Sequence, residues 1–475
     1  MTVDSNIDAD GAREVAAKLA ELCAWVPRVT VRDVPEPIMR RAATVMCDDI
    51  AAIVAARDEP EVMKLQGRMV SRARSDESTV FDGRGGKADR FSAAVANGAA
   101  ADWCELDEGY RRATCHAGLY TIPALIAEAE ATGASTEETL RALVLGYEVA
   151  ARFARAFPVK MPVLHPHASL AAIGAAAGVG ALRRLDAALF NAALTSASTM
   201  VAPGPYGHAV EGALVRNVWP AAGAWCGLQA VEWAECGIGG TPHSPYDVFV
   251  VVFGAGLAAD QFTVGLGDEW ALADGYHKVH ACCQYSHSTV EAIIDLHGRL
   301  GDRMQSVRSI AVETHLLGMT LNNREPATSL AAKFSIPHIA AAACLFGHAG
   351  ADAFMGARLN DAPLAVLREK VELVPYENVP AWPNDRPARV TVTLDDGSRH
   401  SSKCVSARGG PDKPFGPEVI QAKINDIMAP TYPNAPAVVG QCLSLDRSLL
   451  DMRWRDVVAG LVAGASGVSS QLASG

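Results

Sequence analysis

Residues 388–405 read ARVTVTLDDGSRHSSKCV, and this stretch decides the fold. Valine and threonine alternate as far as Leu394, which is typical of a β-strand with one buried face. The DDG at 395–397 supplies a tight turn, and the polar segment ending in KCV completes a predicted antiparallel hairpin. The hairpin stands out because most of the chain on either side of it has the 3.6-residue period of α-helices.

The sheet-forming pattern continues upstream of the hairpin. VRSIAVETHLLGMTL at Val307–Leu321 predicts one strand and Lys370–Val374 predicts another. Between these two, Ala331–Phe346 has the pattern of a helix. We therefore expect an α+β unit over residues 275–406.

The rest of the chain predicts helices, and Ser135 with Glu138 forms a capping box at one helix start. After Pro417 the helical pattern returns and continues toward the C-terminus. The predicted fold is mostly α: a large, discontinuous, all-helical domain (1–274 and 407–475) with an inserted smaller α+β lid domain (275–406). The main predicted helices before the lid are Ala12–Leu22, Glu36–Ala55, Ile122–Thr132, Thr136–Phe157, Ala168–Arg183, Asp186–Val201 and Val210–Ala234.

Composition narrows the range of partners. The chain has 475 residues and a net charge of −11, which argues against nucleic acid and anionic membranes because both need clustered Lys and Arg. No apolar run reaches the roughly 18–20 residues that span a bilayer. The acidic N-terminus does not have the pattern of a signal peptide, and the 11 cysteines are scattered. We therefore predict a cytoplasmic protein with reduced thiols.

The segment ADWCELDEGYRRATCHAGLY at 101–120 concentrates charge in an apolar region. One interpretation is a solvated acidic face in which the two arginines pair with Glu105, Asp107 and Glu108. The other is a charged loop packed against the core, since Trp103 and an apolar run flank it. In that case a carboxylate beside His116 would fix the tautomer of a general acid or base.

Two more segments combine reactive side chains. YHKVHACCQYSH at 276–287 contains Lys278, Cys283 and His287, near the predicted junction between the domains. The ordinary interpretation is packing cysteines beside an exposed lysine. The alternative is an anion site, because a helix that starts near Ser286 would direct its N–H groups toward it. In LVRNVWPAAGAWCG, Arg216 suits either a structural ion pair or a carboxylate clamp.

Two further segments supply candidate ligands. Lys333, in NNREPATSLAAKFSIPH, is a possible carboxylate ligand. His165 and His167, in LHPH, could chelate a metal, but no matching Cys/His pair stands at a recognisable spacing. We therefore expect neither a metal nor a cofactor.

Six motifs in this order resemble the MmgE/PrpD family, and the resemblance covers nearly the whole chain. That family includes 2-methylcitrate dehydratase, cis-aconitate decarboxylase and iminodisuccinate epimerase. The resemblance implies a helical domain, a smaller α+β lid, an active site between them and a homodimer. The motifs are ADWCELDEGYRRATCHAG, VLHPHA, LVRNVWPAAGAWCG, KVHACCQYSH, LAAKFSIPH and RGGPDKPFGP.

The resemblance also implies roles for particular residues. Those with catalytic roles are Glu105, Asp107, His116, Lys278 and His287, and those expected to bind substrate are His165, Arg216, Cys283 and Lys333. The chain departs from the family pattern at Ala117 and Ala281, where the family has proline. Cys283 stands where decarboxylase members have histidine, which disfavours decarboxylation.

The function predicted from these observations is that of a cofactor-free lyase or isomerase acting on a small di- or tricarboxylate. A base, either His116 or Lys278, would remove the proton α to a carboxylate, and cations would stabilise the resulting dianion. A buried lysine near other cations would have the lowered pKa that a base needs. Dehydration and epimerisation both fit this scheme. The alternatives are a decarboxylase of an unsaturated tricarboxylate and a non-catalytic, carboxylate-binding paralogue.

Overall fold

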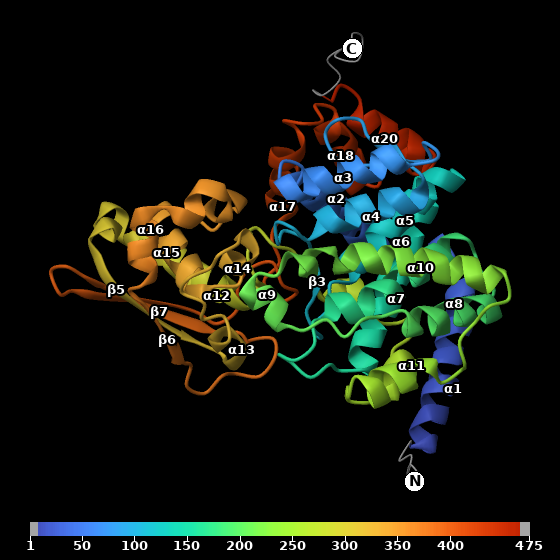
Figure 1. Cartoon of the computed structure of the whole chain (residues 1–475), viewed down its shortest axis with the longest axis horizontal. Helices are drawn as coiled ribbons and strands as arrows, with labels where there is room; N and C mark the ends of the chain where they lie inside the picture. Colours follow the sequence, from blue (N-terminus) through green and yellow to red (C-terminus); the bar gives the residue numbers. More distant parts are fainter. Residues whose placement is uncertain (1–7, 466–475) are drawn as a thin grey trace.

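The computed structural model describes residues 8–465, and most of these residues are helical, as predicted. The larger part of the molecule in Figure 1 is built around α7 (Pro166–Leu182). Every residue of α7 is buried, which identifies it as a core helix. No helix within the described range is long and apolar enough to cross a membrane.

The small residues of α7 allow neighbouring helices to pack closely against it. Its neighbours are α5 (Ala117–Thr132), α6 (Thr136–Ala156) and α10 (Trp219–Glu235). A Cβ atom on Gly178 would lie 2.5 Å from a methyl group of Thr121 in α5. Only glycine permits this approach.

The other long helices surround this core. The C-terminal helices lie beside the N-terminal ones, as the red and blue ribbons of Figure 1 show, and they contact α2, α5 and α6. The N-terminal elements are α1 (Ala9–Trp25), α2 (Glu36–Ala55), α3 (Pro60–Arg72), β1 (Ser78–Thr79), β2 (Lys87–Ala88) and α4 (Arg90–Ala101), whereas α8 (Ala187–Thr199) follows α7 in the chain. Near the C-terminus are α17 (Pro417–Met428), α18 (Ala435–Leu443), α19 (Arg447–Leu450) and α20 (Trp454–Val462).

A four-stranded sheet forms at the left of Figure 1 in the order β6-β5-β7-β8. Strands β7 and β8 make the predicted hairpin, and β5 pairs parallel with β6 and antiparallel with β7. Val390 and Val392 of β7 are buried, whereas alternate residues are more exposed. The strands are β5 (Val307–Thr314), β6 (Val371–Pro375), β7 (Ala388–Leu394) and β8 (Arg399–Cys404).

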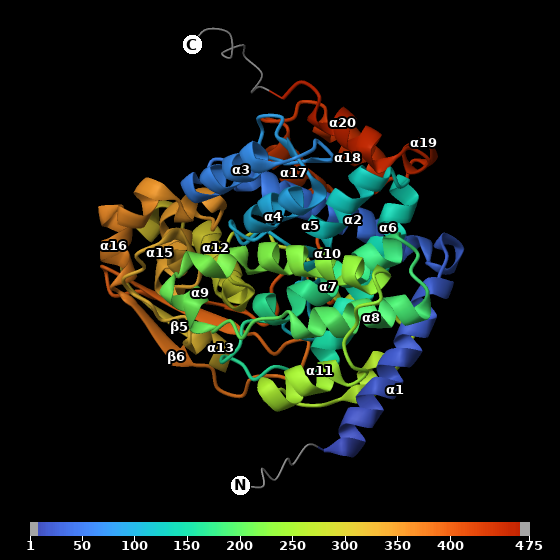
Figure 2. The same ribbon diagram turned by 45° about the vertical axis from the view of Figure 1, so that its right-hand side comes forward.

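Helices pack against this sheet and give the α+β arrangement expected for the lid. They are α12 (His287–Leu300), α15 (Ile336–Phe346) and α16 (Ala362–Arg368). Figure 2, turned by 45°, shows the same helices alongside the strands. The exact domain limits of 275 and 406 stay a prediction.

Three predicted elements were too long. The strand expected to reach Leu321 ends at Thr314 because the chain then turns into α13 (Leu316–Met319). The helix predicted over 331–346 is divided into α14 (Ser329–Lys333) and α15, because Pro337 fits only the first turn of a helix.

The third is the stretch predicted as helix from Val210 to Ala234. It begins within α9 (Gly207–Glu211), is interrupted where Gly212 adopts a φ of 80°, and continues as a 3₁₀ turn at Leu214–Val218 before α10. The shorter elements α11 (Ser244–Tyr246) and a π-helical turn (Asp247–Val252) follow α10.

Residues 102–116, between α4 and α5, carry the charged segment and are called the acidic loop. A short strand pair joins this loop to the start of the predicted lid. Strand β3 (Gly109–Tyr110) pairs antiparallel with β4 (Gly275–Tyr276). Segments about 165 residues apart in the sequence therefore lie side by side. This pairing places Lys278 next to the carboxylates at 102–108.

Candidate active site

A cavity lies where the acidic loop meets the N-terminal end of α7, the 3₁₀ turn before α10 and the segments preceding α12 and β7. Its walls therefore come from both the helical part and the sheet-bearing part of the chain. Five of the predicted site residues line it: Glu105, His116, His165, Arg216 and Cys283.

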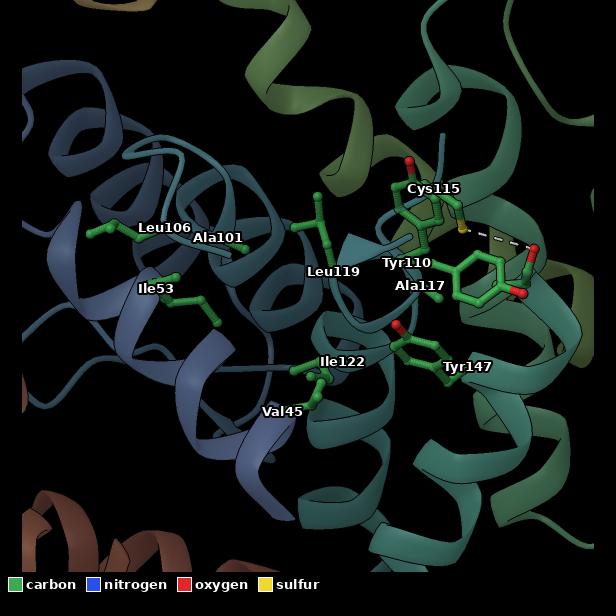
Figure 3. Packing of buried hydrophobic residues seen from close by; sticks show 14 of the residues in the cluster. Val45, Ile53, Ala101, Leu106, Tyr110, Cys115, Ala117, Leu119, Ile122 and Tyr147 are labelled. Atoms are coloured by element: carbon green, nitrogen blue, oxygen red, sulfur yellow. Dashed lines mark hydrogen bonds between the residues drawn. The ribbon is translucent and has the colours of Figure 1, made fainter. Parts of the chain in front are cut away.

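The acidic loop is buried, so the interpretation as a solvated acidic face is wrong. Glu105, Asp107 and Glu108 are each at most 1% exposed. Apolar side chains of the same loop fix it to the core: Figure 3 shows Leu106 near Ile53 of α2 and Tyr110 near Tyr147 of α6. The alternation of apolar anchors and carboxylates holds the charges inside the protein.

Two cations compensate the buried carboxylates. Lys278 Nζ donates to Glu105 Oε2 and to Asp107 Oδ1, each at 3.1 Å. Arg216 Nη1 lies 2.7 Å from Glu105 Oε1 and also donates to Asp102. Removing one member of such a group leaves an uncompensated buried charge, which is costly. We call these five residues the compensated cluster.

Charges within the compensated cluster determine which of its carboxyl groups are ionised. Burial alone would raise the pKa of Glu105, but Arg216 and Lys278 bring it below its usual value. Asp107 is likewise held well below its usual pKa by Lys278 and His116, against the effect of burial. Asp102 is different: burial raises its pKa well above the usual value, although Arg216 opposes the shift.

The prediction of a lowered pKa for Lys278 is wrong. Burial acts in the expected direction, but Asp107 and Glu105 outweigh it and raise the pKa of Lys278 well above its usual value. The lysine therefore stays protonated, since its immediate neighbours are carboxylates rather than cations. In this state Lys278 has no lone pair with which to accept a proton.

His116 and Asp107 form a dyad beside the cluster. His116 Nδ1 lies 2.5 Å from Asp107 Oδ2, and the histidine is the N-cap residue of α5. This contact directs Nε2 of the ring away from Asp107, and the side chain is 13% exposed on the cavity wall. A carboxylate at one ring nitrogen fixes the orientation and the tautomer of the imidazole.

His165 and His167 take part in hydrogen bonds rather than forming a free chelating pair. His165 Nε2 accepts from Arg216 Nε at 3.1 Å. His167 lies between Asp102, 2.8 Å from Nε2, and the hydroxyl of Tyr120, 2.8 Å from Nδ1. Burial lowers the pKa of both histidines well below the usual value, which keeps them neutral.

The three carboxylates of the cluster have oxygens within 4.8 Å of one another, a spacing that suits a metal ion. However, Arg216 and Lys278 already donate to these carboxylates. A divalent cation placed among them would face two fixed positive charges. The donor set therefore fits ion pairing better than metal binding.

Four predicted site residues do not line the cavity: Asp107 and Lys278, which belong to the compensated cluster, and His287 and Lys333. His287 is buried, with Nε2 3.0 Å from the carbonyl oxygen of Cys282. Lys333 is fully buried and donates at 2.7 Å to the carbonyl oxygen of Trp103, so it braces the acidic loop. The substrate contacts expected for these two residues stay a prediction, because the sequence carries no information on the direction of their side chains.

Several residues of the cavity wall were not among the candidates identified in the sequence. Tyr110 and Tyr206 line the cavity, and their hydroxyls have no hydrogen-bond partner among residues 8–465. Tyr276, Tyr285 and Arg386 also line the cavity. Tyr110, Tyr276 and Tyr285 lie inside the quoted segments but were not candidates there, whereas Tyr206 and Arg386 lie outside every motif, so only the three-dimensional arrangement brings these residues together.

Comparison with known families defines the class of protein. Residues 20–250 match the MmgE/PrpD N-terminal domain, and residues 280–444 match the MmgE/PrpD C-terminal domain. The chain therefore belongs to the MmgE/PrpD family, as its sequence motifs predicted.

Similar curated proteins come from filamentous fungi. The cis-aconitate decarboxylase-like protein oryM of Aspergillus oryzae is 24% identical over 440 residues, covering 86% of this chain and 89% of that protein. The cis-aconitate decarboxylase of Aspergillus terreus is 24% identical over 348 residues, covering 68% of this chain and 70% of the fungal enzyme.

Proposed function

We propose that this protein is a lyase or isomerase that removes a proton α to a carboxylate of a small di- or tricarboxylate. The observation that carries the proposal is the His116–Asp107 dyad, which opens on a cavity between the helical and sheet-bearing parts of the chain. Membership of the MmgE/PrpD family and the names of the fungal relatives support the substrate class.

His116 is the base in this proposal. Its Nε2 takes the α-proton, and the C–H electron pair becomes the carbon–carbon double bond of an aci-carboxylate dianion. Asp107, kept ionised by Lys278, stabilises the imidazolium that forms. Lys278 therefore acts by fixing the charge of Asp107, and not as a base.

The tyrosine hydroxyls complete the proposed chemistry. Burial raises the pKa of Tyr206 well above its usual value, so its hydroxyl remains a donor. Directed at the developing dianion, such donors stabilise negative charge without being neutralised by protein carboxylates. The dianion then either expels a β-hydroxyl, which leaves as water after protonation, or takes a proton on its other face.

Decarboxylation is the second candidate, because two of the relatives are named for it. In this route the substrate loses CO₂ and an acid of the site protonates the carbon left behind. Cys283 lines the cavity, and burial raises the pKa of its thiol to about 12. The thiol therefore stays protonated, but it cannot supply the imidazole that decarboxylase members have at this position, which favours α-proton abstraction over decarboxylation.

The test is proton NMR in D₂O with a panel of hydroxy-, amino- and unsaturated polycarboxylates. The proposal expects at least one compound to exchange its α-proton for deuterium or to lose or gain water, and His116→Gln to abolish the reaction. Release of CO₂ from an unsaturated tricarboxylate would support the decarboxylase instead. Binding without exchange, turnover or CO₂ release by any compound would indicate a non-catalytic paralogue. Light scattering would test the expected homodimer.

A further inference from the structure

We propose that Arg386, which no sequence motif identified, is the cation that binds a carboxylate of the substrate. This inference rests on the proposed polycarboxylate function and assigns the binding role to a different residue. Arg386 lies in the loop before β7 and lines the same cavity as His116. The predicted clamp, Arg216, belongs instead to the compensated cluster.

The cations near the cavity differ in their partners. Arg216 lies against Asp102 and Glu105, and Lys278 donates to Glu105 and Asp107. A substrate carboxylate approaching either cation would meet the negative charge already beside it. The positive charge of Arg216 and Lys278 is consequently compensated by carboxylates of the protein itself.

Arg386 has a neutral partner. Its Nη1 donates to the amide oxygen of Gln284, and its guanidinium carbon lies 4.7 Å from the centre of the Tyr285 ring. The nearest carboxylate, that of Asp385, is 3.8 Å from Arg386 Nε. That carboxylate is engaged by Arg111 Nη2 at 2.5 Å. The positive charge of Arg386 is therefore largely uncompensated and can attract an incoming anion.

The position of Arg386 also fits a path for the substrate. Besides the inner cavity, it lines an outer pocket of about 540 Å³ that includes Arg111 and Arg112. Thr114 and Tyr285 line both spaces, so the outer pocket adjoins the site. Within this pocket Arg111 pairs with Asp385 and Arg112 with Asp274, so Arg386 is the arginine whose charge an incoming anion would meet.

The chemistry of the guanidinium completes the assignment. Its planar fork binds a carboxylate through two parallel hydrogen bonds, and an aromatic ring beneath it holds the plane in place. Replacing the amide of Gln284 by a substrate carboxylate exchanges a neutral acceptor for a charged one. A substrate held there by one carboxylate would extend along the cavity wall toward His116.

The test measures binding and turnover separately. Binding of tricarballylate, a saturated tricarboxylate without a hydroxyl group, is measured by calorimetry for the wild type, Arg386→Met and Arg386→Lys. We expect Arg386→Met to weaken binding roughly 10- to 100-fold, the range for a charge-assisted hydrogen bond. Arg386→Lys should recover part of the loss, since it restores charge without the fork. For the substrate found by NMR, KM should rise while kcat at saturation stays within about threefold.

Arg389→Met is the matched control. Arg389 lies three residues away on β7, is exposed, and pairs with Glu313 at 2.8 Å. This variant should bind tricarballylate as the wild type does. If Arg386→Met also bound with wild-type affinity while the wild type remained active, the assignment of Arg386 would be overturned and the proposed function would stand. If the wild type bound no polycarboxylate and exchanged none, both proposals would fail together.

Discussion

Charged side chains on the two sides of the cavity have different kinds of partner. On the helical side, every carboxylate of the compensated cluster contacts Arg216 or Lys278. On the side formed by the sheet-bearing part, Arg386 has the amide of Gln284 as its partner, and Tyr276 and Tyr285 line the same cavity. The first side holds ions in fixed positions, whereas the second offers charge and donors to a ligand.

The difference teaches that the number of charged residues in a site does not show which of them binds substrate. Arg216 and Lys278 were the obvious carboxylate ligands in the sequence, but buried carboxylates already compensate them. Their effect is indirect, because they keep Glu105 and Asp107 ionised.

The largest effect is expected from Lys278→Met. The substitution leaves Glu105 and Asp107 facing each other without their shared cation, so the free energy of unfolding should fall by about 3–5 kcal/mol. Urea unfolding followed by circular dichroism checks this result. Activity should fall as well, because Asp107 would take up a proton. Unchanged stability would show that the lysine is not needed for compensation.

His116→Gln should reduce kcat by roughly two to four orders of magnitude, the range for loss of a general base. KM should change little, because the carboxylate-binding group is Arg386. Steady-state kinetics on the substrate identified by NMR provides the measurement. His165→Gln is the matched control: His165 is on the same cavity wall but is held neutral beside Arg216, and it should retain far more activity.

A smaller effect is expected in the pH dependence of stability, to which the buried carboxyl group of Glu108 contributes. Its carboxyl has neutral donors, the Gly118 N–H at 2.7 Å and the Tyr147 hydroxyl at 2.9 Å, and burial raises its pKa to about 8 from 4.5. Between these two values the unfolded chain ionises Glu108 while the folded protein keeps it protonated. Stability should therefore fall as pH rises from about 4.5 to 8.

Glu108→Gln removes this titration while keeping the shape of the side chain. The loss of stability with rising pH should be smaller in the variant than in the wild type by up to about 1.4 kcal/mol per pH unit. Thermal melts at half-unit pH steps measure the difference. Parallel pH curves for the two proteins would show that Glu108 ionises normally in the folded state.

The smallest effect is expected from chelation. Since Arg216 and Lys278 already lie against the three carboxylates that could hold a divalent ion, prolonged EDTA treatment should leave kcat unchanged. Loss of activity with EDTA, recovered on adding a divalent ion, would mean that a metal displaces these cations. The compensated cluster would then need to be reinterpreted as a metal site.

The sequence predicted the fold well wherever a local pattern controls it. Helix α2 was predicted with its exact limits, and the turn at 395–397 places Gly397 at a φ of 82°. Errors arose where tertiary packing or a proline decides, as at Thr314 and Pro337. Motifs located the segments of the site, but burial and pairing determined the state of Lys278 in a way that no motif encodes.

The most direct test of the account compares His116→Gln with Arg386→Met in D₂O at saturating substrate. The account predicts that His116→Gln binds the substrate but incorporates almost no deuterium. It predicts that Arg386→Met needs far more substrate yet exchanges at close to the wild-type rate once saturated. Equal loss of exchange in both variants at saturation, or normal exchange in His116→Gln, would contradict the division between a catalytic side and a binding side.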